Sequence, residues 1–289
     1  MMMNKCGFAR IGAVVGAVCT ILVLSANAHA DQSDWVQGYD NKARLIAMAK
    51  PREGSQAAYA AGLEIQMSPG FKTYWRSPGE AGGVPPEFDW TGSDNLASAQ
   101  VLYPAPHRLI DKAGANIGYK DHVIFPVEIT PQDPSKPVKL HLKAVYGVCK
   151  NICIPAEVEM EFEVSDKTEI DAELASAVAS VPKLLDVAEK TSGSTAPELD
   201  SWRIEKRGSK AMLVMDVAGE GAEGDVFLFS DEGIYLPMTN KVKPNLFEAD
   251  LTDAGDLKDL AGKKIWVTMV GTKGQSETLI SLPEDIAKP

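Results

Sequence analysis

Apolar and polar residues alternate along much of the chain, and this period-two pattern constrains the fold more than any other feature of the sequence. The clearest run is residues 157–164, where Val158, Met160, Phe162 and Val164 interleave with four glutamates. Successive side chains of a β-strand point to opposite faces of the sheet, so this pattern is typical of a strand with one buried face. The sequence therefore predicts a protein built mainly from half-buried strands.

Similar alternation recurs through the first half of the chain, with turns rich in Pro, Gly and Asp between the segments. The segments are residues 63–67, 72–75, 97–103, 123–129 and 138–146. Six or seven short strands separated by such turns are typical of an antiparallel, immunoglobulin-like sandwich. We therefore expect one β-sandwich domain over residues 31–165.

The pattern changes after residue 165. Residues 169–190 are rich in Ala, Leu and Glu with helical spacing, interrupted by Pro182, and a Ser/Thr/Gly stretch follows at 191–195. This predicts a helical connector and linker over residues 166–197. Strand-like segments then return at residues 202–206, 212–217, 226–229, 246–251, 265–270 and 278–282. The expected fold class is all-β: two immunoglobulin-like β-sandwich domains joined by a short helical connector, with a second, smaller β domain over 198–289.

Residues 1–30 have the features of a cleaved secretory signal peptide. Lys5 and Arg10 precede an apolar run at residues 11–24, and Ala28-His29-Ala30 follows as a small-residue cleavage site. The run is shorter than the roughly 20 residues that cross a bilayer as a helix, so we expect no membrane insertion after cleavage. Cleavage would change the formal net charge from −11 to −13, which makes nucleic acid a poor partner.

The chain has four cysteines, of which only Cys149 and Cys153 lie beyond the signal segment. In an extended strand their Cα atoms would be about 13 Å apart, from four steps of about 3.3 Å. A disulfide needs Cα atoms within about 7 Å. If the two sulfurs bond, the chain must therefore turn at residues 150–151, directly after the strand expected at 138–146.

Three functions of the cysteine pair remain open from its spacing: redox exchange, a structural disulfide, or metal ligation. A closed loop of about 5 residues contributes roughly 2 kcal/mol in the chain-entropy estimate, against about 4.7 for a loop of about 100, so the pair is a weak staple. A small ring is also more easily exchanged, which favours the redox function. Metal ligation would add imidazoles from His107, His122 or His141 and would suit copper or zinc.

Residues 219–224 fit the dinucleotide pattern G-x-G-x-x-G, but a strand rather than a helix is expected to follow, and the two glutamates would repel a pyrophosphate, so we expect a hairpin loop there. The sequence shows no hydrolase motif and no phosphate-binding G-K-[ST] loop. We expect no bound metal or cofactor.

Five segments of the first domain resemble a known family, the periplasmic amino-terminal domain of the disulfide reductase DsbD and its relatives in copper-tolerance (Scs) systems. The resemblance spans about residues 42–164. The segments are residues 70–79 (GFKTYWRSPG), 85–90 (PPEFDW), 103–108 (YPAPHR), 118–119 (GY), and 146–149 with 152–156 (YGVC and ICIPA). The resemblance implies an immunoglobulin-like fold, a periplasmic location and a link to copper tolerance and cytochrome c biogenesis.

The resemblance also implies functions for individual residues. Cys149 and Cys153 would be the exchanging pair. A cap loop with a hydrophobic shield covers the family's active site, and residues 108–111 match it, so Leu109 or Ile110 would be the shield. Tyr74 is similar to a tyrosine beside the family's cysteines, although strand packing would explain it equally. Lys150 is adjacent to Cys149 and would favour its thiolate, which gives a weak preference for Cys149 as the attacking thiol.

Two departures from the family pattern limit what the resemblance implies. The best-known member spaces its cysteines more widely, and the sequence here shows neither membrane segments nor a terminal thioredoxin domain. We expect a periplasmic thiol-disulfide oxidoreductase that relays electrons between a membrane-embedded thiol reductase and periplasmic thioredoxin-like proteins. The alternatives are a copper-handling periplasmic protein and a redox-silent adaptor with a structural disulfide.

Overall fold

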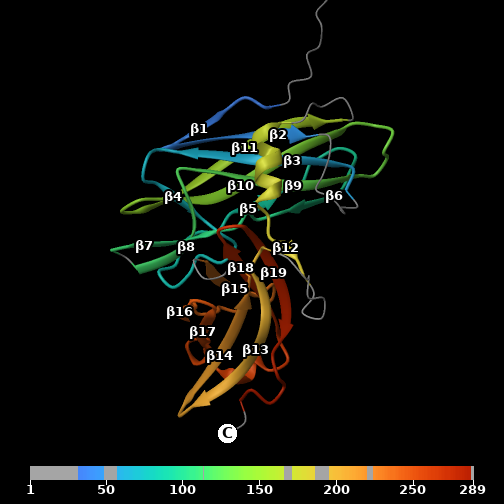
Figure 1. Ribbon diagram of the computed structural model, residues 1–289. Helices are drawn as coiled ribbons and strands as arrows, with labels where there is room; N and C mark the ends of the chain where they lie inside the picture. The colour runs from blue at the N-terminus through green and yellow to red at the C-terminus, as the bar shows by residue number, and fades with distance from the viewer. Residues whose placement is uncertain are drawn as a thin grey trace, which may run out of the picture.

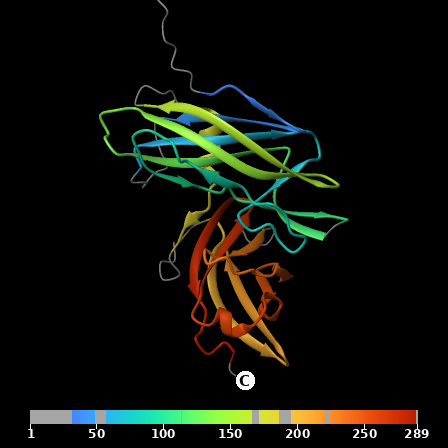
Figure 2. The ribbon, with the colours of Figure 1, turned by 180° about the vertical axis from the view of Figure 1, so that it is seen from behind.

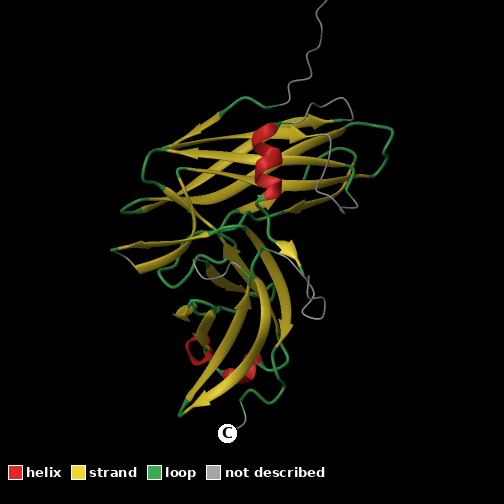
Figure 3. Cartoon of the chain, in the orientation of Figure 1, coloured by secondary structure: helices red, strands yellow, loops and turns green. Residues whose placement is uncertain are grey.

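The computed structural model describes residues 32–48, 57–112, 114–165, 171–185, 195–219 and 224–287, so the expected signal segment at 1–30 lies outside the described residues. Two β-sandwiches follow one another along the chain (Figure 1). Strands dominate both, as Figure 3 shows. The structure confirms the expected all-β, immunoglobulin-like fold class. No helix in the described part of the chain is long and apolar enough to cross a membrane.

The first sandwich consists of a five-stranded and a six-stranded sheet. The five-stranded sheet has the order β1 (Val36–Gly38), β2 (Asn41–Met48), β3 (Tyr59–Met67), β9 (His122–Pro131) and β6 (Leu96–Val101). The six-stranded sheet has the order β11 (Cys153–Val164), β10 (Val138–Cys149), β4 (Lys72–Tyr74), β8 (Gly114–Lys120) and β7 (His107–Asp111), and β5 (Glu87–Asp89) also pairs with β10. β11 and β7 therefore form the two edges of the second sheet.

The second sandwich consists of two four-stranded sheets. One has the order β12 (Lys183–Leu184), β19 (Gly274–Ser281), β18 (Lys264–Gly271) and β15 (Asp225–Phe229). The other has the order β13 (Glu198–Arg207), β14 (Lys210–Ala218), β17 (Leu246–Asp250) and β16 (Asn240–Lys243), and the 3-10 helices η2 (Leu251–Ala254) and η3 (Leu257–Leu260) follow β17. Figure 2 shows this sandwich below the first, viewed from behind.

The cores follow from the alternation of apolar side chains. Leu63 and Ile65 of β3 and Phe125 of β9 face the same core as Leu140 and Leu142 of β10, and all are buried. Burying a side chain of this size stabilises the fold by about 1.5–3 kcal/mol. A separate core fills the second sandwich, with members from β14, β17 and β18. Each sandwich thus has a core of its own.

The connector differs from the sequence-based expectation. The helix α1 covers only Ala172–Ala179, shorter than the helical pattern at residues 169–190. Asp171 caps it by accepting a hydrogen bond from the backbone N–H of Leu174 at 2.8 Å. Leu174 packs on the outer face of the five-stranded sheet, where Gly62 leaves room because a Cβ there would be 2.8 Å from its side chain. Within the described residues beyond α1, β12 pairs in parallel with β19. The expected Ser/Thr/Gly linker at 191–195 and the helical pattern at 186–190 lie almost entirely outside the described residues.

Aromatic residues join the two sandwiches. The Trp75 ring, just after β4, lies 6.1 Å from the ring of Phe227 and 6.0 Å from that of Phe229, both on β15. Phe227 and Met238 of the second sandwich belong to the core cluster of the first. Arg76 adds an ion pair to Glu277 on β19. Phe227 and Met238 therefore pack against the core of the first sandwich, while the second sandwich keeps a separate core.

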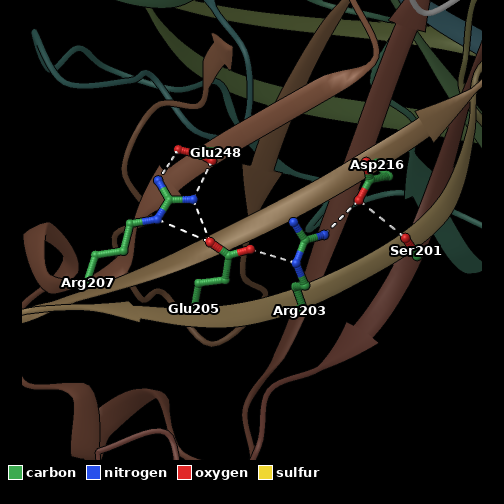
Figure 4. Close-up of polar contacts among 6 residues, drawn as sticks. All are labelled: Ser201, Arg203, Glu205, Arg207, Asp216 and Glu248. Atoms are coloured by element: carbon green, nitrogen blue, oxygen red, sulfur yellow. Dashed lines mark hydrogen bonds and ion pairs between the residues drawn. The ribbon is translucent and has the colours of Figure 1, made fainter. Parts of the chain in front are cut away.

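The exposed face of the β13–β14–β17 sheet carries a chain of ion pairs (Figure 4). Arg203 lies between Glu205, at 2.7 Å, and Asp216, at 2.8 Å. Arg207 contacts Glu205 at 2.6 Å and Glu248 at 2.7 Å. The arginine side chains are nearly half exposed, so these contacts compete with water and each stabilises the fold little.

Candidate functional site

The cysteine pair closes the β10–β11 hairpin of the first sandwich. Cys149 is the last residue of β10 and Cys153 the first of β11, and the two are register partners joined by a disulfide with a Cα–Cα distance of 4.1 Å. The chain turns at residues 150–152, where the N–H of Lys150 donates to the Ile152 carbonyl at 3.1 Å. The turn that disulfide geometry required is therefore present. On its other side Cys149 pairs with Lys72 of β4.

The two sulfur-bearing residues differ in access. Cys149 lies inside the sheet and is 1% exposed, whereas Cys153 is on the edge strand and exposed. Thiol-disulfide exchange begins when a thiolate attacks one of the two sulfurs, and access decides which. An incoming thiolate can reach Cys153, and its attack there would leave Cys149 as the departing thiolate. This geometry opposes the sequence-based preference for Cys149 as the attacking thiol.

Tyr74 lies beside the sulfur of Cys153. Its hydroxyl oxygen is 3.0 Å from the Sγ of Cys153, and it must be the donor because a disulfide sulfur carries no hydrogen. Burial of the hydroxyl, with a smaller effect of the Asp111 charge, raises the pKa of Tyr74 above its usual 10.0. The hydroxyl therefore keeps its proton near neutral pH and can donate to a Cys153 thiolate, which would favour that thiolate.

A glycine loop, residues 78–84, covers the Tyr74 ring. Gly83 adopts a φ of +157°, and a Cβ there would lie 2.4 Å from the ring, so glycine is required at this close approach. The loop is tied on both sides: Asn116 donates to the Gly82 carbonyl at 2.7 Å, and the Gly147 N–H donates to the Val84 carbonyl at 3.0 Å. Tyr74 is thus held between β10 and this loop.

Lys72 is a buried cation in the same strand as Tyr74. Its residue is 7% exposed, and its Nζ contacts the Asp111 carboxylate at 2.6 Å and also the Asn116 side-chain oxygen. The Nζ lies 6.0 Å from the centre of the Tyr74 ring. Asp111 ends β7, so this contact fastens the β7–β8 hairpin to the strand next to Cys149. Sequence reasoning missed Lys72 and Asp111, although both lie in segments that matched the family.

The remaining expected site residues fall in different places. Leu109 is buried, and strand alternation puts it on the same face of β7 as Asp111, the face that reaches Lys72. Ile110 is 75% exposed and on the opposite face. That Leu109 or Ile110 shields the cysteines stays a prediction. Lys150 turns away from the disulfide, because its Nζ donates to the Pro69 carbonyl at 3.2 Å and lies over the Phe71 ring.

The histidines considered as metal ligands have other neighbours. His122 contacts Glu64 at 3.0 Å, and these two with Glu173 bring their ligand atoms within 4.8 Å of one another. Arg44 already compensates the Glu64 charge at 2.6 Å, which disfavours a cation there. His141 contacts the Thr91 carbonyl at 2.7 Å and Glu159 at 2.9 Å. These contacts direct both imidazoles to oxygen atoms rather than to the cysteines.

His107 begins β7 and pairs in register with Gly118 of β8. It is exposed, and strand alternation places its side chain on the same face of β7 as Leu109. It lies on the same hairpin as the expected shield residues.

Comparisons with known proteins identify a related family and a solved structure of similar fold. Residues 32–165 match the family described as thiol:disulfide interchange protein DsbD, N-terminal. The fold is similar to the crystal structure of the N-terminal periplasmic domain of ScsB from Proteus mirabilis, with a TM-score of 0.64, 21% sequence identity, and coverage of 88% of this chain and 98% of that one. At 21% identity the similarity shows a shared fold only. Because the match covers 88% of this chain, the shared fold includes the second sandwich. No curated protein matches the chain. Residues 32–165, which carry the cysteine pair, are a DsbD-like amino-terminal domain.

Proposed function

We propose that this protein is a periplasmic thiol-disulfide interchange protein that relays electrons through Cys149 and Cys153. The relay would run between a membrane-embedded thiol reductase and thioredoxin-like proteins. The observation that carries the proposal is an exposed Cys153, whose sulfur is bonded to a buried Cys149 and contacted by a protonated tyrosine hydroxyl at 3.0 Å. The family match of residues 32–165 supports the same chemistry.

Reduction of the pair takes two exchange steps. A partner thiolate attacks the Cys153 sulfur, the Cys149–Cys153 bond breaks, and Cys149 leaves as a thiolate while a mixed disulfide forms. The partner's second thiolate then attacks the partner sulfur of that mixed disulfide and releases the Cys153 thiolate. Two electrons have moved to this protein, and the partner leaves with a disulfide.

Delivery to a client reverses these steps. The Cys153 thiolate attacks a client disulfide and forms a mixed disulfide, and the client's other sulfur leaves as a thiolate. Cys149 then attacks the Cys153 sulfur, which restores the Cys149–Cys153 bond and releases the reduced client. Donation from Tyr74 favours the Cys153 thiolate, and the burial of Cys149 protects the resolving thiol from competing reactions.

Trapping tests this assignment. Cys149→Ser removes the resolving thiol, so periplasmic expression of that variant should accumulate covalent adducts to a thioredoxin-like protein that dithiothreitol releases. Cys153→Ser should accumulate none, because its remaining thiol is buried. Adducts on Cys153→Ser alone would show that Cys149 is the exchanging thiol and Cys153 the resolving thiol. If both variants fold and neither forms adducts, the exchange function is contradicted and a redox-silent adaptor is favoured.

A further inference from the structure

The second sandwich contacts the β7–β8 hairpin through a forked ion pair. Arg108 of β7 donates from Nε and Nη2 to the two carboxylate oxygens of Asp225, each at 2.7 Å. The same Nη2 donates to the Thr239 carbonyl at 2.9 Å. Both side chains of the ion pair are about one-quarter exposed. A two-point contact of this kind fixes orientation as well as distance.

The same part of the second sandwich also contacts the glycine loop. The Met238 backbone N–H donates to the Glu80 carboxylate at 3.3 Å. The Met238 sulfur lies 3.2 Å from where a Cβ of Gly79 would be. Met238 and Thr239 are neighbours in the chain, so one short segment, together with Asp225, holds both elements.

The hairpin and the glycine loop each contact a residue that neighbours the cysteine pair. Three residues beyond Arg108, Asp111 contacts Lys72 at 2.6 Å, and Lys72 is the register partner of Cys149. The glycine loop covers the Tyr74 ring, whose hydroxyl contacts Cys153. A shift of the hairpin or of the loop would therefore change the surroundings of one or both sulfurs.

We propose that Asp225, with the backbone of Met238 and Thr239, forms a clamp that positions the cysteine site from the second sandwich. Asp225 is a positioning residue: it acts on Cys153 through the hairpin, the glycine loop and Tyr74. The proposal rests on the assignment of Cys153 as the exchanging sulfur. The second sandwich has no cysteine or histidine. Under this proposal it would still influence the reactivity of Cys153 in the first sandwich.

The competing explanation is that the ion pair only holds the two sandwiches together. Arg76 and Glu277 provide the matched control, because they also form an ion pair between the sandwiches and are similarly buried. Glu277 lies on β19, and the contacts of its carboxylate are to Arg76 and Thr268, outside the hairpin and the loop. Loss of either pair should weaken the domain contact, but only loss of the Asp225 pair should change Cys153.

The test compares Asp225→Asn with Glu277→Gln in the full chain. The reduced proteins are alkylated with iodoacetamide across a pH series, and peptide mass spectrometry follows Cys153 alone. We expect Asp225→Asn to shift the midpoint of Cys153 alkylation upward by about half a pH unit to one unit, which slows alkylation near neutral pH about three- to tenfold. Glu277→Gln should leave the midpoint unchanged.

Arg108→Lys is a milder second variant, since it keeps the charge but loses the fork, and it should give a smaller shift in the same direction. Equal shifts in the Asp225 and Glu277 variants, or no shift in any variant, would overturn the clamp. Alkylation reports Cys153 without any protein partner. If no alkylation shift is seen but Cys149→Ser traps a partner, the clamp is wrong and the proposed function stands. If the shift is seen but no partner is trapped, the clamp stands and the proposed function is wrong.

Discussion

The two sandwiches use ion pairs in different surroundings. At the cysteine end of the first, Lys72 is buried and its Nζ contacts Asp111 and Asn116 beside the cysteine pair. On the second, Arg203 and Arg207 form a chain of contacts on a solvated face (Figure 4). Charges interact more strongly where water is excluded, and loss of one partner there leaves the other unsatisfied. The number of ion pairs in a domain therefore says less about stability and reactivity than their burial does.

The largest expected effect is that of Lys72→Met. The substitution removes a buried cation that donates to the oxygen of buried Asn116, so we expect the free energy of unfolding to fall by about 2 kcal/mol. Urea denaturation of the oxidised protein measures it. Lys263→Met is the control, because Lys263 pairs with Glu232 on the exposed surface of the second sandwich. If both variants shift the urea midpoint equally, burial does not distinguish the two kinds of pair.

Tyr74→Phe should have the next largest effect, and mainly on reactivity. Without the hydroxyl the Cys153 thiolate loses a donor at 3.0 Å, so we expect alkylation of Cys153 at neutral pH to slow about three- to tenfold. Tyr119→Phe removes another buried hydroxyl, which donates to the Pro104 carbonyl at 2.8 Å, and should leave alkylation unchanged. Equal rates for wild type and Tyr74→Phe would show that Tyr74 serves only packing.

Arg207→Ala tests the exposed side of the comparison. Arg207 contacts Glu205 and Glu248, but its side chain is 46% exposed, so we expect the melting temperature to fall by less than about 2 °C. The loss should shrink further in high salt, because salt screens exposed charges. A larger loss that resists salt would show that the chain of ion pairs acts as one cooperative network.

His141→Gln should have the smallest effect, and that effect should depend on pH. Contacts with the Thr91 carbonyl and then Glu159 raise the pKa of His141 above its usual 6.5. A raised pKa in the folded state stabilises the protein fully below the unfolded pKa, and this contribution is lost as pH rises through the folded pKa. The melting-temperature difference between wild type and His141→Gln should thus be larger near pH 5.5 than near pH 9. An equal difference at both pH values would contradict this.

The alternation of side chains predicted β10 and β11 because burial of one face decides both the pattern and the fold. Six or seven strands were expected in the first sandwich, whereas its described residues form eleven, and β2 and β8 were not among the expected segments.

The cysteines could be singled out from sequence because their identity carries their chemistry, whereas Tyr74 was indicated only by the resemblance to the family. Lys72 and Asp111 were missed because they are 39 residues apart in the chain. The local sequence around each residue does not indicate that the two side chains form a contact.

The connector was expected to have helical spacing over residues 169–190 with an interruption at Pro182. In the described residues α1 ends at Ala179, and Lys183 and Leu184, directly after Pro182, pair with β19 instead of continuing a helix.

The reduction potential of the Cys149–Cys153 pair tests redox exchange most directly. Equilibration of the folded protein in glutathione or dithiothreitol buffers, with the thiols counted by alkylation, gives the value. The pair closes a five-residue ring in which Cys153 is an exposed residue, and exposed disulfides have higher potentials than buried structural ones. We predict a potential above about −300 mV, the value below which structural disulfides usually lie. A value well below that would contradict the exchange function and identify the bond as a structural staple.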